Sequence, residues 1–138
     1  MSMRKMIATA TLLLGLGSAA SSFAQAPKAP CILGKHHVTA VAPLKVQERQ
    51  GRASVVQVRG ADIFVQAEPG LTAEWLRSEI DRHVAGMHGM AMKDCALDLH
   101  GVKVRVDSAG AGFSVKVIGR DSQQAQEILH RARMLLDG

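Results

Sequence analysis

Residues 102–136 read VKVRVDSAGAGFSVKVIGRDSQQAQEILHRARMLL, and their hydrophobic pattern decides the fold of the chain. Apolar and polar residues alternate on both sides of a glycine-rich turn at 108–112, which predicts a β-hairpin with one buried face. The apolar spacing then becomes helical. Asp121 or Ser122 is the predicted N-cap, and Gln124 follows Asp121 by three residues as in a capping box. The buried stripe expected on this helix is Ala125, Ile128, Leu129, Ala132 and Leu136.

A similar order of hairpin and helix precedes this stretch. Residues 38–46 alternate in the same way, and Pro43 predicts an edge strand or a bulge there. Residues 53–59 and 63–67 are rich in β-branched residues and are separated by a predicted turn at 60–62. Thr72 is the predicted N-cap of the next helix. Its apolar face is expected to carry Leu76, Ile80, His83, Val84 and Met87.

These patterns predict the α+β class, with a small antiparallel sheet and two helices on one of its faces. The expected order is ββ(β)αββα, that is, two hairpins, with a three-stranded meander in the first half as the alternative. We expect one domain over residues 38–138, preceded by a flexible leader at 25–37. The solvated face of the sheet is expected to carry Lys103, Arg105, Asp107 and Lys116.

Methionine and histidine are concentrated in residues 83–95, which read HVAGMHGMAMKDC. Thioethers are soft donors that select Cu(I) or the similar Ag(I), and imidazole also accepts copper. The alternative is that the methionines fill gaps in the core, where they pack adaptably. The candidate metal ligands are His83, Met87, His88, Met90 and Met92.

The chain has two cysteines, Cys31 and Cys95, and both lie after the predicted signal peptide at residues 1–24. An even number in an oxidising compartment favours one disulfide, and the alternatives are two thiolate ligands or free thiols. A disulfide would place His36 and His37 near the methionine-rich loop. These two histidines are therefore additional candidate ligands.

Residues 1–24 have the layout of a cleavable signal peptide. Arg4 and Lys5 precede an apolar run at 6–17, and a small-residue stretch offers cleavage after Ala24. The alternative is a membrane anchor, but the run is shorter than the roughly 20 residues that a spanning helix needs. We therefore expect a protein of the Gram-negative periplasm, or a secreted one, with no transmembrane anchor after cleavage.

Charge and motifs narrow the classes of function. The formal net charge of +5 becomes +3 without Arg4 and Lys5, and the basic residues are scattered in a chain without tyrosine. A nucleic-acid partner is therefore not expected. No motif places a nucleophile beside a base, so we do not expect an enzyme. We expect a small exported accessory protein that binds another envelope protein and needs no cofactor. The alternative is a periplasmic copper-binding protein or chaperone that uses the Met/His-rich loop.

Overall fold

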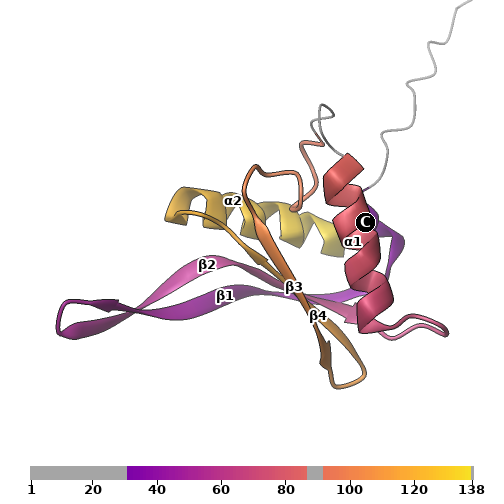
Figure 1. Cartoon of the computed structure of the whole chain (residues 1–138), viewed down its shortest axis with the longest axis horizontal. Helices are drawn as coiled ribbons and strands as arrows, with labels where there is room; N and C mark the ends of the chain where they lie inside the picture. Colours follow the sequence, from indigo (N-terminus) through magenta and orange to yellow (C-terminus); the bar gives the residue numbers. More distant parts are fainter. Residues whose placement is uncertain (1–30, 87–91, 138) are drawn as a thin grey trace, which may run out of the picture.

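The structure is a computed structural model that describes residues 31–86 and 92–137. Its four strands form one antiparallel sheet in the order β1-β2-β4-β3 (Figure 1). The predicted α+β class is confirmed, with the order ββαββα. The elements are the 3-10 turn η1 (Ile32–Lys35), β1 (Val38–Gln50), β2 (Ala53–Gln66), α1 (Ala73–Gly86), β3 (Lys103–Ala109), β4 (Gly112–Ile118), α2 (Ser122–Arg133) and the 3-10 turn η2 (Met134–Leu136).

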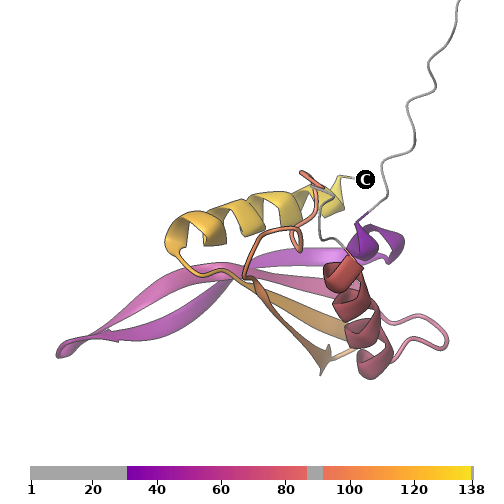
Figure 2. The same ribbon diagram turned by 45° about the horizontal axis from the view of Figure 1, so that its top comes forward.

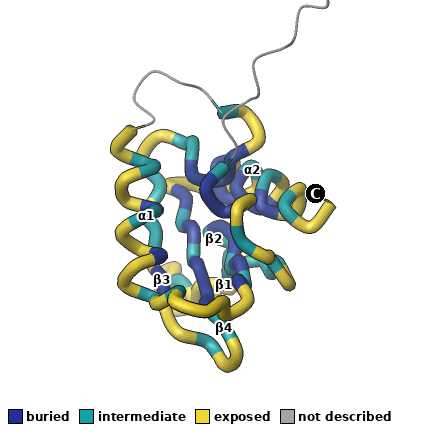
Figure 3. Tube along the Cα trace, turned by 90° about the vertical axis from the view of Figure 1, so that its right-hand side faces the viewer, coloured by how far each residue is buried: buried dark blue, intermediate teal, exposed yellow. Residues whose placement is uncertain are grey.

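Both helices cover the same face of the sheet (Figures 2 and 3). Alternate residues of the strands point to this face, and they form one buried cluster with apolar residues of α1 and α2. The N-terminal turn η1 also contributes to this core, because Leu33 is fully buried. The central members of the cluster are Ile63, Val65, Leu76, Ile80, Val106, Val115, Val117, Ile128 and Leu129.

The first hairpin consists of two long strands, so the three-stranded meander is wrong. Gly60 pairs with Leu44 and the next pair is Val58 with Lys45, which leaves Arg59 as the extra residue of a bulge. Gly60 has a φ of 156°, and a Cβ atom there would lie 1.8 Å from the carbonyl oxygen of Val117. The glycine therefore serves a bulge and a close approach of β4 rather than a turn between two strands.

The predicted helix caps are confirmed. The hydroxyl of Thr72 accepts a hydrogen bond from the Trp75 amide at 3.2 Å at the start of α1. The carboxylate of Asp121 accepts one from the Gln124 amide at 2.8 Å at the start of α2. The Gln124 side chain completes this cap by accepting a bond from the amide of Arg120 at 2.7 Å.

The end of the last helix departs from the predicted stripe. Leu136 was expected to be buried, but it is 45% exposed. It lies in η2, whose 3-10 geometry has three residues per turn and so rotates the apolar face relative to the preceding helix. Leu135 packs against the core instead.

The face of the sheet opposite the helices is charged near β3 and β4. In the register of β3 and β4, Arg105 lies opposite Lys116. The next residues along the two strands, Val104 and Val117, lie opposite each other and point to the helix side. The ammonium group of Lys116 lies 3.0 Å from the carboxylate of Asp107. Lys103 and Arg105 are exposed, as the sequence predicted.

The far half of the β1–β2 hairpin extends beyond the rest of the sheet (Figures 1 and 2). Strand β4 pairs with β2 only over Gly60–Gln66. Residues 45–59, which we call the arm, are therefore bonded as strands only to each other within the described chain. A turn at Gly51 and Arg52 closes the arm.

Candidate functional site

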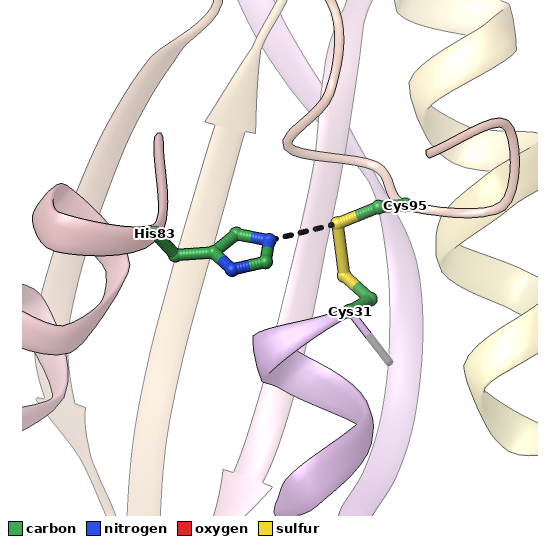
Figure 4. Close-up of side chains that lie close together, drawn as sticks. All are labelled: Cys31, His83 and Cys95. Carbon is green, nitrogen blue, oxygen red and sulfur yellow. Dashed lines mark hydrogen bonds between the residues drawn. A yellow bond between two sulfur atoms is a disulfide. The ribbon is translucent and has the colours of Figure 1, made fainter. Parts of the chain in front are cut away.

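Three side chains from separate segments meet at one end of the domain (Figure 4). Cys31 precedes η1, His83 lies in the last turn of α1, and Cys95 lies in the loop between α1 and β3. Cys31 and Cys95 form a disulfide, which confirms the pairing that the sequence favoured. The imidazole Nε2 of His83 points at Cys95 Sγ from 3.8 Å. The two sulfurs and a ring nitrogen all lie within 4.8 Å of one another.

Core packing holds these segments in place independently of the disulfide. Ile32 and Leu33, the two residues after Cys31, are both buried. On α1, Leu76 and Ile80 are buried, and His83 follows Ile80 by one turn of helix. The loop contributes Cys95 and the two apolar residues that follow it, all buried. The three segments therefore converge because each contributes apolar side chains to one core.

Helix α2 holds the loop that carries Cys95. The guanidinium of Arg131 donates hydrogen bonds to the carbonyl oxygens of Met92 and Cys95 at 3.4 and 3.3 Å. Glu127, one turn earlier on α2, accepts a bond from the same guanidinium at 2.7 Å. Within the loop, the Met92 amide donates to the carboxylate of Asp98. These bonds fix the backbone on both sides of Cys95.

The surroundings of His83 favour its neutral form. Burial lowers the pKa of His83, the positive charge of Lys35 lowers it further, and the carboxylate of Asp98 acts in the opposite direction. A neutral imidazole has one nitrogen with a lone pair, which can accept a hydrogen bond or bind a metal. Neutral His83 can therefore donate a weak N–H···S hydrogen bond from Nε2 to Cys95 Sγ. In the other tautomer, the Nε2 lone pair is free to bind a metal ion.

Of the other candidate ligands in the methionine-rich loop, the structure describes only Met92. Met87, His88 and Met90 lie outside the described residues. Met92 is partly buried and packs against the core. The proposed use of this loop as a metal site thus remains a prediction for Met87, His88 and Met90.

His36 and His37 occupy a different environment from the disulfide. The ring nitrogens of His36 lie 3.6 Å from the carboxylates of Glu68 and Glu79, and the ring is edge-on to Trp75. Only 8% of the His36 side chain is exposed. The amide of His37 donates to Glu68 at 3.4 Å. The structure therefore groups these two histidines with acidic residues of α1 and the segment before it.

Sequence reasoning did not foresee that His83 would lie against the disulfide. The sequence places His83 among the candidate ligands of the methionine-rich loop and favours a disulfide between the two cysteines, with thiolate ligands or free thiols as the alternatives. The available signal was that His83 ends a helix shortly before Cys95, while Cys31 precedes the apolar pair Ile32 and Leu33. That pattern does not indicate which segments pack together. Only the folded structure shows that His83 lies against the disulfide.

The arm is a second candidate site, and its surface is apolar and basic. Val46, Val55 and Val56 are 39%, 37% and 61% exposed. Glu48 on the arm pairs with Arg59 at 3.2 Å. On the arm, the exposed cations that have no ion pair within the described residues are Lys45, Arg49 and Arg52.

Comparison with known proteins identifies no relative of this chain. No protein-family model matches the chain, and neither a search of curated proteins nor one of solved structures gives a match.

Proposed function

We propose that this chain is a small, non-enzymatic accessory protein that is exported by the signal peptide at residues 1–24 and works in the periplasm. Its task is to bind an acidic envelope protein through the arm at residues 45–59. The observation that carries this proposal is the extension of the β1–β2 hairpin beyond the sheet. In the described chain, no helix is long and apolar enough to cross a membrane.

The first support is the energetics of the arm. A two-stranded hairpin alone is at best marginally stable in water, because each strand is hydrogen-bonded on one side and little apolar surface is buried. Val55 and Val56 are nevertheless exposed on it. An apolar partner surface would remove these valines from water. Each strand of the arm also has a second edge that meets no strand of the described chain, although the Arg59 carbonyl at the base of the arm accepts a bond from the Gly119 amide. An extended segment can bind to the remaining edge by strand addition.

The second support is charge. The arm carries four basic side chains and one acidic one. Two copies of such an arm repel each other, which disfavours self-pairing at the exposed strand edges. An acidic partner is attracted, and electrostatic complementarity accelerates its association. The arm therefore fits an acidic protein better than a second copy of this chain.

The test begins with a photo-crosslinking amino acid at Val56 in intact cells. We expect a specific adduct with one acidic protein, and none from the same probe at Gln126, an exposed position on α2. The captured protein is then purified and its affinity for the chain is measured by calorimetry. The double variant Arg49→Glu/Arg52→Glu should weaken binding by about tenfold or more, with a smaller dependence on salt.

A matched control changes the net charge equally on β3, a strand that does not pair with the arm. Lys103→Glu/Arg105→Glu alters two exposed cations of β3 and should leave the affinity within about twofold. Equal weakening by both double variants would contradict docking at the arm. Arm-dependent binding to phosphatidylglycerol vesicles without a protein adduct, or a dimer that Val56→Ser disrupts, would replace the proposed partner with a membrane or a second copy.

A further inference from the structure

The disulfide site brings together the donor atoms of a soft-metal site, but the S–S bond prevents the two sulfurs from binding as thiolates. Cys31, His83 and Cys95 supply two sulfurs and one imidazole nitrogen within 4.8 Å of one another. While the sulfurs are bonded to each other, neither is a thiolate, and thiolates are the form that binds metal strongly. Reduction of this one bond changes the chemistry of the site without requiring the chain to bring distant residues together.

We propose that reduction of the Cys31–Cys95 disulfide creates a Cu(I) site whose ligands are the two cysteine sulfurs and His83 Nε2. The reductant is an external dithiol. It transfers two electrons and two protons to the cysteine pair, the S–S bond breaks, and the dithiol becomes a disulfide. Cu(I) then displaces the two thiol protons as it binds. This inference is independent of the arm and of its partner.

The fold supports the site after the disulfide opens. Cys31 is held by the burial of Ile32 and Leu33, and the backbone at Cys95 is held by Arg131 of α2. Helix α1 is anchored to the sheet by its buried residues and by a 2.7 Å hydrogen bond from Arg77 to the carbonyl oxygen of Val106. Rotation of a cysteine about its Cα–Cβ bond then separates the sulfurs enough to admit an ion, while the backbones stay in place.

The ligand set favours Cu(I) over other metals. Thiolates are soft ligands and select Cu(I) and Zn(II), and imidazole binds both. Structural zinc is almost always held by four protein ligands in a tetrahedron. The described residues place three such donors together, at Cys31, His83 and Cys95. Within the described residues, these three donors suit a trigonal Cu(I) ion and leave structural zinc one ligand short.

The test compares oxidised and reduced protein in anaerobic Cu(I) titrations against the chelator bicinchoninate. We expect the reduced protein to bind one Cu(I) on the order of 100-fold more tightly than the oxidised protein, as thiolate ligation implies. Changing both cysteines to Ala should abolish the difference. Equal affinity of the oxidised and reduced forms would overturn the proposal and would favour the methionines and histidines of residues 83–92 as the ligands.

The role of His83 is tested separately, because His83→Gln retains both thiols. This variant should lose about tenfold in affinity, and X-ray absorption should show one nitrogen neighbour fewer at the copper. His130→Gln changes an exposed histidine of α2 and serves as the matched control, with unchanged affinity and spectrum. An unchanged absorption spectrum in His83→Gln would exclude His83 from the ligand set and overturn the proposed site.

A thermal unfolding measurement distinguishes a folded site from adventitious thiol binding. Cu(I) that binds only the folded, reduced domain must raise its Tm, because binding to the native state stabilises it by mass action. Cu(I) bound equally by unfolded thiols leaves the Tm unchanged. A reduced domain that is unfolded without metal should fold when Cu(I) is added, as followed by circular dichroism, and failure to fold would overturn the proposal.

Discussion

The Cys31 and Cys95 Cα atoms are 5.2 Å apart although 64 positions separate them in the chain. Their disulfide joins the start of η1 to the loop between α1 and β3. This bond therefore closes a loop that contains the entire first hairpin and the first helix. It links the stability of the domain to the redox state of the compartment.

Removing the disulfide should destabilise the domain substantially. The chain-entropy model assigns about 4 kcal/mol to a loop of this length, and we expect the Cys31→Ala/Cys95→Ala variant to lose about 2–4 kcal/mol of unfolding free energy. Urea denaturation of oxidised samples measures this difference. Wild type treated with a reductant is the control and should unfold near the midpoint of the variant. Equal midpoints for oxidised wild type and variant would contradict the expectation.

Gly60 is predicted to be the least replaceable glycine of the sheet. In Gly60→Ala the new methyl group would meet the carbonyl oxygen of Val117, so a strand must shift, and the loss should be about 3 kcal/mol or more. Gly110→Ala is the matched control: φ is also positive, at 57°, but nothing lies within 4 Å of the added carbon. That variant should lose only about 1–2 kcal/mol. Similar changes in Tm for the two would refute the role assigned to the close approach at Val117.

The pair of Asp107 and Lys116 should make a small, pH-dependent contribution to stability. A hydrogen bond from Lys116, followed by its positive charge, lowers the pKa of Asp107 below the ordinary value of 3.8. Between the folded pKa and pH 3.8, the carboxyl group of Asp107 therefore binds more protons in the unfolded chain than in the folded one. Its contribution to stability is complete above pH 3.8 and disappears as the pH falls through the folded pKa. NMR titration of Lys116→Met should show the pKa of Asp107 rising toward its ordinary value. Lys103→Met, an exposed cation of the same face, should change that pKa much less.

Arg131 is predicted to control the mobility of the loop that carries Cys95. In Arg131→Met the carbonyls of Met92 and Cys95 lose their charged donor, and a hydrogen bond to a charged group contributes about 1.5–3 kcal/mol. The amides of Cys95 and Asp98, which are bonded within the loop, should therefore exchange with deuterium roughly tenfold faster or more. Arg133→Met, an exposed change on the same helix, should not alter their exchange. Accelerated exchange throughout the sheet in Arg131→Met would indicate global destabilisation instead of local release.

Much of the fold could be predicted because its signals are local. The alternation around residues 108–112 located the second hairpin, and Thr72 and Asp121 located both helix starts. Gly60 was misread, because a glycine at a bulge and a glycine in a turn look alike in sequence. Only the pairing of β2 with β4 distinguishes the two cases.

The candidate site was predictable in part. Pairing of Cys31 with Cys95 followed from their even number and the expected compartment, and the structure contains that bond. The position of His83 beside Cys95 did not follow, because it depends on how the end of α1 packs against a loop that begins several residues later. The structure places His36 beside Glu68 and Glu79. Its approach to Met90 stays a prediction, because Met90 lies outside the described residues.

The sequence by itself determined the element types, their order and the buried side of most of them. These properties follow from periods of two or 3.6 residues and from capping side chains, which act over a few neighbouring positions. Only the tertiary structure decided that residues 45–59 extend beyond the sheet and that His83 faces the disulfide. Both depend on strand register and on packing between segments far apart in the chain, where many arrangements share one hydrophobic pattern. The energy of the whole core selects among those arrangements.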